Sequence, residues 1–93
     1  MGDCCVYILT NKSRAVFYIG VTNDLQRRLA EHGEEDRGFE GRYNLKLLVH
    51  VEQSSEAKSA ITRQKQLKGW RRSKKIALIT RGNPYWNNLA EAF

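Results

Sequence analysis

The segment FYIGVTNDLQRRLAEH, residues 17–32, joins an apolar run directly to an amphipathic one. Its first letters complete AVFYIG (15–20), a β-branched and aromatic stretch that is typical of a strand and ends at Gly20. One of the polar residues Thr22–Asp24 can cap the helix that follows over DLQRRLAEH, and Gly33 can end it. The segment therefore predicts a strand, a break and a helix in direct succession.

Outside this segment, we expect two more strands and two more helices. Apolar and β-branched residues predict strands over CCVYILT (4–10) and LKLLVHVE (45–52). Helices are expected over EAKSAITRQKQLK (56–68) and RRSKKIALIT (71–80), although the apolar run of the second could also form a strand. The order ββαβαα indicates one α+β domain over residues 1–93, with a small core.

Composition and cysteine usage narrow the class of protein. No apolar run approaches the ~18 residues that a membrane-spanning helix needs, and no secretory signal is visible, so we expect no membrane partner. Cys4 and Cys5 are neighbours in a predicted strand and point to opposite faces, which favours a reduced, cytoplasmic setting. Only His32 and His50 could complete a zinc site, so such a site is not expected.

Positive charge is concentrated in the second half of the chain, whose formal net charge is +6. No Asp or Glu occurs from Ala57 to Ala90, whereas this window holds nine Lys and Arg residues. A one-sided basic surface favours a polyanion, most often nucleic acid, and the alternative is a solvated face that aids solubility. The residues that we expect to contact nucleic-acid phosphates are Lys65, Lys68, Arg71, Arg72 and Lys74.

Two neighbouring arginines of the first helix are predicted to differ in environment. Two leucines one turn apart define the buried stripe of this helix, and Arg28 and His32 lie beside the stripe on one side. Arg27 and Glu31 fall on the opposite face, where they can pair in solvent. Because Arg28 runs along the edge of the core, its guanidinium needs an anionic or acceptor partner.

The first two strands are expected to form a hairpin. If Lys12 and Ser13 form a tight two-residue turn, Tyr7 lies opposite Tyr18 on one face of the sheet. Geometry alone does not distinguish a functional pair of tyrosines from a pair that only packs.

At this point the residues resemble a known family of nucleases, the GIY-YIG family. Its two-part signature is degenerate in the first half, Cys5-Val6-Tyr7, and intact in the second, Tyr18-Ile19-Gly20. The stretches VTNDLQRRLAEH, GFEGRYN, QLKGW and NPYWNNL look like the small stand-alone bacterial members related to the nuclease domain of the excision-repair incision subunit. The resemblance covers roughly residues 5–90 and implies a three-stranded antiparallel sheet flanked by helices.

The resemblance also implies a reaction, in which a phosphodiester is cleaved by an activated water and one divalent metal, Mg²⁺ or Mn²⁺. Tyr7 and Tyr18 match the signature tyrosines, one of which acts as, or assists, the general base. Arg28 matches the arginine that contacts the scissile phosphate, and His32 matches a histidine that positions groups or relays protons. Alternatively, His32 has no catalytic role and only interacts favourably with the dipole at the C-terminal end of its helix.

Further site residues are implied by the later motifs. Asn83 or Asn87 corresponds to the family's late asparagine. Arg42 and Tyr43, at the end of the glycine-rich loop, could line the cleft and touch the substrate backbone; alternatively Tyr43 packs and Arg42 is solvated.

One position departs from the family pattern. The family has a metal-binding glutamate within Arg-Glu-Lys, whereas this chain reads Arg63-Gln64-Lys65. Helical projection places Gln64 inward, on a face that it shares with Ala57, Ala60, Ile61 and Leu67. A neutral carbonyl is a much weaker ligand for magnesium than a carboxylate, so cleavage could be lost.

Three explanations of Gln64 remain open at this stage. The chain is a natural homologue that does not cleave, a variant engineered to be inactive, or a nuclease in which another acid, such as Glu52 or Glu56, compensates. Two main functions follow: a metal-dependent endonuclease, active or inactivated, and a non-catalytic nucleic-acid-binding module of the same fold. A protein-interaction domain with an acidic partner is a third. Because so small a domain has little surface for specificity, a targeting protein or a homodimer is also expected.

Overall fold

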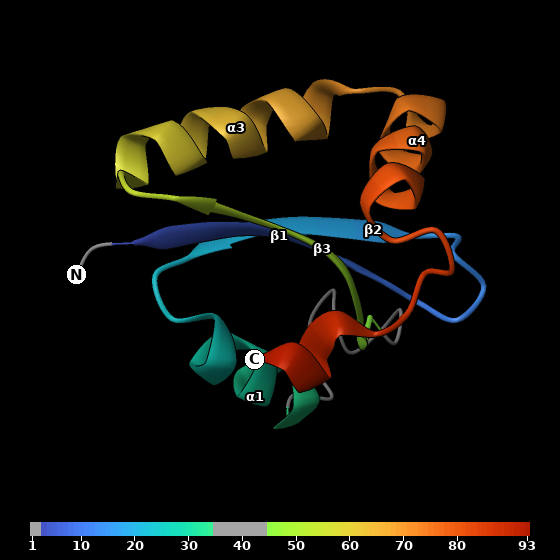
Figure 1. Cartoon of the computed structure of the whole chain (residues 1–93), viewed down its shortest axis with the longest axis horizontal. Helices are drawn as coiled ribbons and strands as arrows, with labels where there is room; N and C mark the ends of the chain where they lie inside the picture. The colour runs from blue at the N-terminus through green and yellow to red at the C-terminus, as the bar shows by residue number, and fades with distance from the viewer. Residues whose placement is uncertain (1–2, 35–44) are drawn as a thin grey trace.

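The computed structural model describes residues 3–34 and 45–93 (Figure 1). Within these residues the elements follow the expected order ββαβαα, and the run that could have been strand or helix is a helix. A short 3-10 helix, η1, is added near the C-terminus. The elements are β1 (Cys4–Thr10), β2 (Phe17–Thr22), α1 (Leu25–Glu34), β3 (Leu47–Ser54), α3 (Ala57–Gly69), α4 (Arg72–Gly82) and η1 (Leu89–Ala92).

The three strands form one antiparallel sheet in the order β2-β1-β3, so the first strand of the chain is central. Helices α3 and α4 cover one face of the sheet, and α1 and η1 lie on the other (Figure 1). This is the α+β architecture and the antiparallel sheet that the sequence predicts.

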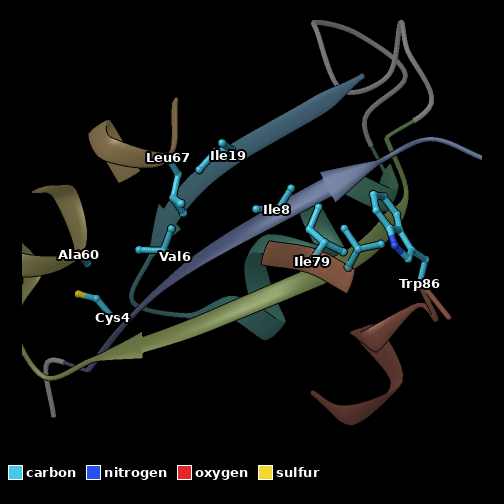
Figure 2. Packing of buried hydrophobic residues seen from close by; sticks show 9 residues of the cluster. Cys4, Val6, Ile8, Ile19, Ala60, Leu67, Ile79 and Trp86 are labelled. Atoms are coloured by element: carbon cyan, nitrogen blue, oxygen red, sulfur yellow. The ribbon is translucent and has the colours of Figure 1, made fainter. Parts of the chain in front are cut away.

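Alternation along β1 divides the core into two layers, because successive side chains of a strand point to opposite faces. One layer contains Val6 and Ile8 and packs against Leu67 and Ile79 of the α3–α4 side (Figure 2). The other layer contains Tyr7 and packs against α1 and η1. Tyr7 is therefore a core residue of the face that α1 covers.

The β1–β2 connection is longer than predicted, and the expected pairing is wrong. Tyr7 pairs with Gly20 rather than with Tyr18, and Tyr18 pairs with Leu9. The reason is a six-residue loop over residues 11–16 in place of a two-residue turn. Since the register shifts by two residues, each side chain keeps its face, and Tyr7 and Tyr18 remain on the same side of the sheet.

A polar side chain stabilises this loop. The Asn11 Oδ1 atom accepts hydrogen bonds from the Ala15 N–H at 2.9 Å and from the Ser13 hydroxyl at 3.2 Å. The Asn11 carbonyl accepts a bond from the Arg14 N–H at 2.9 Å, and Arg14 has a positive φ of 59°. Lys12 and Ser13 therefore do lie at the centre of a turn, but this turn is part of a longer loop and the strands do not pair directly against it.

Fewer residues of α3 face the sheet than the helical projection predicts. Ala60 and Leu67 are fully buried and Gln64 is half-buried, as expected, but Ala57 is exposed and 44% of Ile61 is exposed. Ile61 lies about 100° around the helix from Ala60, at the edge of the face that meets the sheet. None of the helices in the described residues is long and apolar enough to cross a membrane.

Candidate active site

Tyr7 and Gly20 are fitted to each other across the β1–β2 pair. The Tyr7 side chain is fully buried, and its ring lies over the backbone of Gly20. A Cβ atom at position 20 would lie 2.5 Å from the Tyr7 hydroxyl oxygen and 2.6 Å from its Cζ atom. The glycine of the YIG stretch is therefore required because it leaves space for the phenol of the opposite strand.

Tyr7, Tyr18 and Arg28 come together on the α1 face of the sheet. The two tyrosine ring centroids are 6.2 Å apart with an interplanar angle of 42°. The Arg28 Nε–H donates a hydrogen bond to the Tyr7 hydroxyl oxygen at 3.2 Å. This hydrogen bond is the main reason why the pKa of Arg28 is raised, and Tyr18 raises it further. The guanidinium therefore stays charged beside both phenols.

Helix α1 separates the two arginines as the sequence predicts. The Asp24 carboxylate caps the helix by accepting the Arg27 N–H at 3.1 Å. The Arg27 side chain is 75% exposed and pairs with Glu31 at 3.5 Å, whereas that of Arg28 is 35% exposed. Glu31 also lies 3.4 Å from Arg28 Nη1. Arg28 is thus held between a carboxylate and a phenol and keeps a partly open guanidinium.

Burial decides how Tyr7 can act. Desolvation raises the pKa of Tyr7 to about 12, and the hydrogen bond from Arg28 opposes this only in part. At neutral pH the Tyr7 phenol is therefore protonated, and its oxygen accepts the Arg28 N–H. In this state Tyr7 can orient Arg28 or a bound oxyanion, but it is a poor proton acceptor. Tyr18 is half-buried and is the more accessible phenol of the two.

Gln64 reaches the edge of the sheet from α3. Its Nε2–H donates a hydrogen bond to the main-chain carbonyl of Ile19 at 3.2 Å. Ile19 stands between the two signature residues Tyr18 and Gly20, so Gln64 contacts the backbone of the strand that carries them. The amide nitrogen is the group that this contact requires, because a carboxylate oxygen would face the carbonyl oxygen without a proton between them.

The donors around position 64 do not fit a magnesium or manganese site. The nearest candidate ligand is a neutral amide, and hard divalent cations select anionic oxygen. Glu31, a carboxylate beside Arg28, is paired with both Arg27 and Arg28. Within residues 3–34 and 45–93, no group of three or more His, Cys, Asp and Glu side chains is arranged to hold a metal ion. Position 64 therefore offers an amide in place of the carboxylate that the family resemblance leads one to expect.

The acids considered as substitutes for Gln64 are placed elsewhere. The Glu52 carboxylate accepts two hydrogen bonds from Arg63, at 2.8 and 3.1 Å, and lies 2.8 Å from His50 Nε2. Although burial opposes ionisation, the bonds from Arg63 and His50 hold the pKa of Glu52 below its ordinary value. Glu52 belongs to β3, whereas the tyrosine site lies between β1 and β2. Glu56 is exposed at the start of α3.

Other predicted site residues have varied positions. The backbone of His32 lies in α1, but its side chain is outside the described residues, as are Arg42 and Tyr43. Asn83 is buried, and its amide donates to the Val49 carbonyl at 3.2 Å and to the Asn87 carbonyl at 2.9 Å. Its Oδ1 atom accepts the Asn87 N–H at 3.0 Å. These bonds tie the C-terminal tail to β3, and a part for Asn83 in the site stays a prediction.

The predicted basic residues divide into several environments. Lys65, Lys68 and Arg71 are exposed on or next to α3. Arg72 donates to the carbonyls of Arg14 and Ala15 and therefore fastens α4 to the β1–β2 loop. The Lys74 ammonium lies 4.1 Å from the centre of the Trp70 ring.

The arrangement defines a class of protein. A three-stranded antiparallel sheet presents two tyrosines beside an arginine of the next helix, which is the pattern of a nuclease-type catalytic domain. The chain belongs to the GIY-YIG family, because residues 3–77 match the GIY-YIG catalytic domain.

Two proteins illustrate the relationship. The UPF0213 protein NP_0776A of Natronomonas pharaonis is 34% identical over 79 residues, which cover 83% of this chain and 91% of that protein. The solution NMR structure of the UPF0213 protein BH0048 from Bacillus halodurans is 27% identical to the chain, with a TM-score of 0.59. This match covers 92% of each chain, so the likeness includes the whole domain and not only the signature.

Proposed function

We propose that this chain binds the phosphodiester backbone of nucleic acid, with DNA as the first class to test, at a site formed by Tyr7, Tyr18 and Arg28. We further propose that Gln64 leaves it with little or none of the metal-dependent hydrolysis that an endonuclease of this family carries out. The observation that supports this most directly is the Gln64 amide, which donates to the Ile19 carbonyl where a metal ligand would need a carboxylate.

The binding half of the proposal rests on charge and geometry. Arg28 is held charged and in a fixed position by the Tyr7 hydroxyl, and its guanidinium is partly exposed. A guanidinium offers paired donors that match the oxygens of a phosphate, and Tyr18 adds a hydroxyl on the same face. The positive window of residues 57–90 supplies the surrounding field that attracts a polyanion.

The chain itself provides a matched control for the binding test. We expect Arg28→Ala to lower the affinity for a short labelled DNA duplex by ~10-fold or more, since a phosphate contact by a partly buried guanidinium is lost. Arg27→Ala removes the same charge from the neighbouring, solvated position and should change the affinity by no more than about 2-fold. Equal losses in the two variants would mean that the protein binds DNA through net charge and not through this site.

Cleavage is tested by restoring the carboxylate. With Mg²⁺ or Mn²⁺, we expect the natural chain to leave plasmid and branched DNA intact and Gln64→Glu to cleave at least one of them. Cleavage by the natural chain at the rate of Gln64→Glu would instead make it an active endonuclease and would refute the assignment to Gln64. Failure to bind any nucleic acid, with binding to an acidic protein, would favour a protein-interaction domain.

A further inference from the structure

A hollow opens at the outer edge of β2, where α3 and α4 approach the strand. Its volume is about 300 Å³. Residues of three elements line it: Phe17, Tyr18 and Ile19 of β2, Lys68 of α3 and Lys75 of α4. Tyr18 lines this hollow and also belongs to the tyrosine–arginine site, so the two places share one residue of the edge strand.

Two lysines give the hollow a positive charge. The described residues that line it include two ammonium groups and no carboxylate, and neither lysine has an ion pair in the part of the chain that the structure describes. Lys68 is one helical turn beyond Gln64, so the two residues share a side of α3. Lys75 is partly buried, and Arg72, which precedes it by one turn of α4, is fastened to the β1–β2 loop. The position of Lys75 against β2 is therefore set by a tertiary contact.

An anionic occupant fits this place better than an added peptide strand. The main-chain carbonyl of Ile19, on the edge of β2, already accepts the Gln64 amide. A strand that extends the sheet needs the edge carbonyls for itself, whereas a phosphate needs only cationic and N–H donors.

We propose that Lys68 and Lys75 hold a backbone phosphate next to the one bound at Arg28, so that a nucleic-acid strand runs along the edge of β2. This inference rests on the proposed function, because it extends the phosphate site in one direction. Two phosphates of one strand on either side of Tyr18 would fix the direction in which the strand passes the site. A domain of this size can orient its ligand in this way without reading bases.

The test compares two variants with the same change in charge. Lys68→Gln/Lys75→Gln neutralises the β2 edge, and Lys12→Gln/Lys46→Gln neutralises two exposed lysines outside the positive window of residues 57–90. Binding to a short labelled DNA duplex and to the same single strand is measured over a salt series. We expect the first pair to lower the affinity ~10-fold at low salt and to reduce the slope of log affinity against log salt by about 1, and the control pair to leave the slope unchanged.

The outcomes separate this inference from the proposed function. If Arg28→Ala weakens binding but Lys68→Gln/Lys75→Gln behaves like the control pair, the phosphate track along β2 is wrong and the site at Arg28 stands. If the natural chain binds neither the DNA duplex nor the single strand, the proposed function itself is wrong. If the lysine pair abolishes binding of an acidic peptide but not of DNA, the hollow is a peptide site and the inference is overturned.

Discussion

Replacing Gly20 by alanine tests the fit between the two signature strands. Gly20 does not have a positive φ, and alanine in a strand ordinarily stabilises a protein by about 0.4–1 kcal/mol relative to glycine. Here the new Cβ would lie 2.5 Å from the Tyr7 hydroxyl oxygen and 2.6 Å from Cζ, inside a core in which Tyr7 is fully buried. The phenol must therefore move, and it cannot keep its bond to Arg28.

The size of the effect follows from these two losses. Overpacking a tight core costs about 1–3 kcal/mol, and a hydrogen bond to a charged donor contributes about 1.5–3 kcal/mol. We therefore expect Gly20→Ala to lower the free energy of unfolding by about 3 kcal/mol or more. For a domain of this length that corresponds to a fall in Tm of ~12 °C or more.

Denaturant unfolding in three backgrounds identifies the cause. The penalty of Gly20→Ala should be largest with Tyr7 present, smaller in Tyr7→Phe, which lacks the hydroxyl but keeps Cζ, and below about 1 kcal/mol in Tyr7→Leu. An equal penalty in all three backgrounds would show that the phenol is not the obstacle, and a stabilised Gly20→Ala protein would refute the reasoning outright.

Two other residues give further predictions. Because the pKa of Tyr7 is raised from 10 to about 12, its stabilising contribution is complete below pH 10 and is lost as the pH rises toward 12. The natural chain should lose about 2–3 kcal/mol of unfolding free energy over this interval that Tyr7→Phe does not lose, as measured by urea unfolding. Asn83→Ala removes three hydrogen bonds to the backbone, one buried and two partly buried, and should destabilise the protein by about 2–3 kcal/mol. Asn87→Ala is the control for it, because only the backbone of Asn87 takes part in those bonds; equal Tm values of the two variants would contradict the structural role of Asn83.

The elements and the faces of the site were predictable because they depend on local periodicity. The spacing in α1 predicts Arg28 beside the buried stripe of the helix and Arg27 in solvent, and the structure confirms this. Gln64 was also predicted to point inward. In each case the residues concerned lie within one helix or one strand.

Features that depend on several elements were not predictable. The hairpin register follows from the way in which Asn11 folds a six-residue loop, and no Asn-Gly turn signals it in the sequence. Lys75 reaches the edge of β2 because Arg72 fastens α4 to that loop, a contact between residues nearly sixty positions apart. The hydrogen bond from the Gln64 amide to the Ile19 carbonyl likewise depends on how α3 packs on the sheet, which the sequence of α3 does not reveal.

The most direct test of the account is a titration of the natural chain and of Gln64→Glu with Mn²⁺, followed in amide correlation spectra. We expect paramagnetic broadening of the Ile19 and Gly20 amides in Gln64→Glu, because it carries a carboxylate beside them, and no selective broadening there in the natural chain. Selective broadening of these amides in the natural chain, at the same Mn²⁺ concentration as in the variant, would contradict the claim that Gln64 leaves the site without a metal ligand.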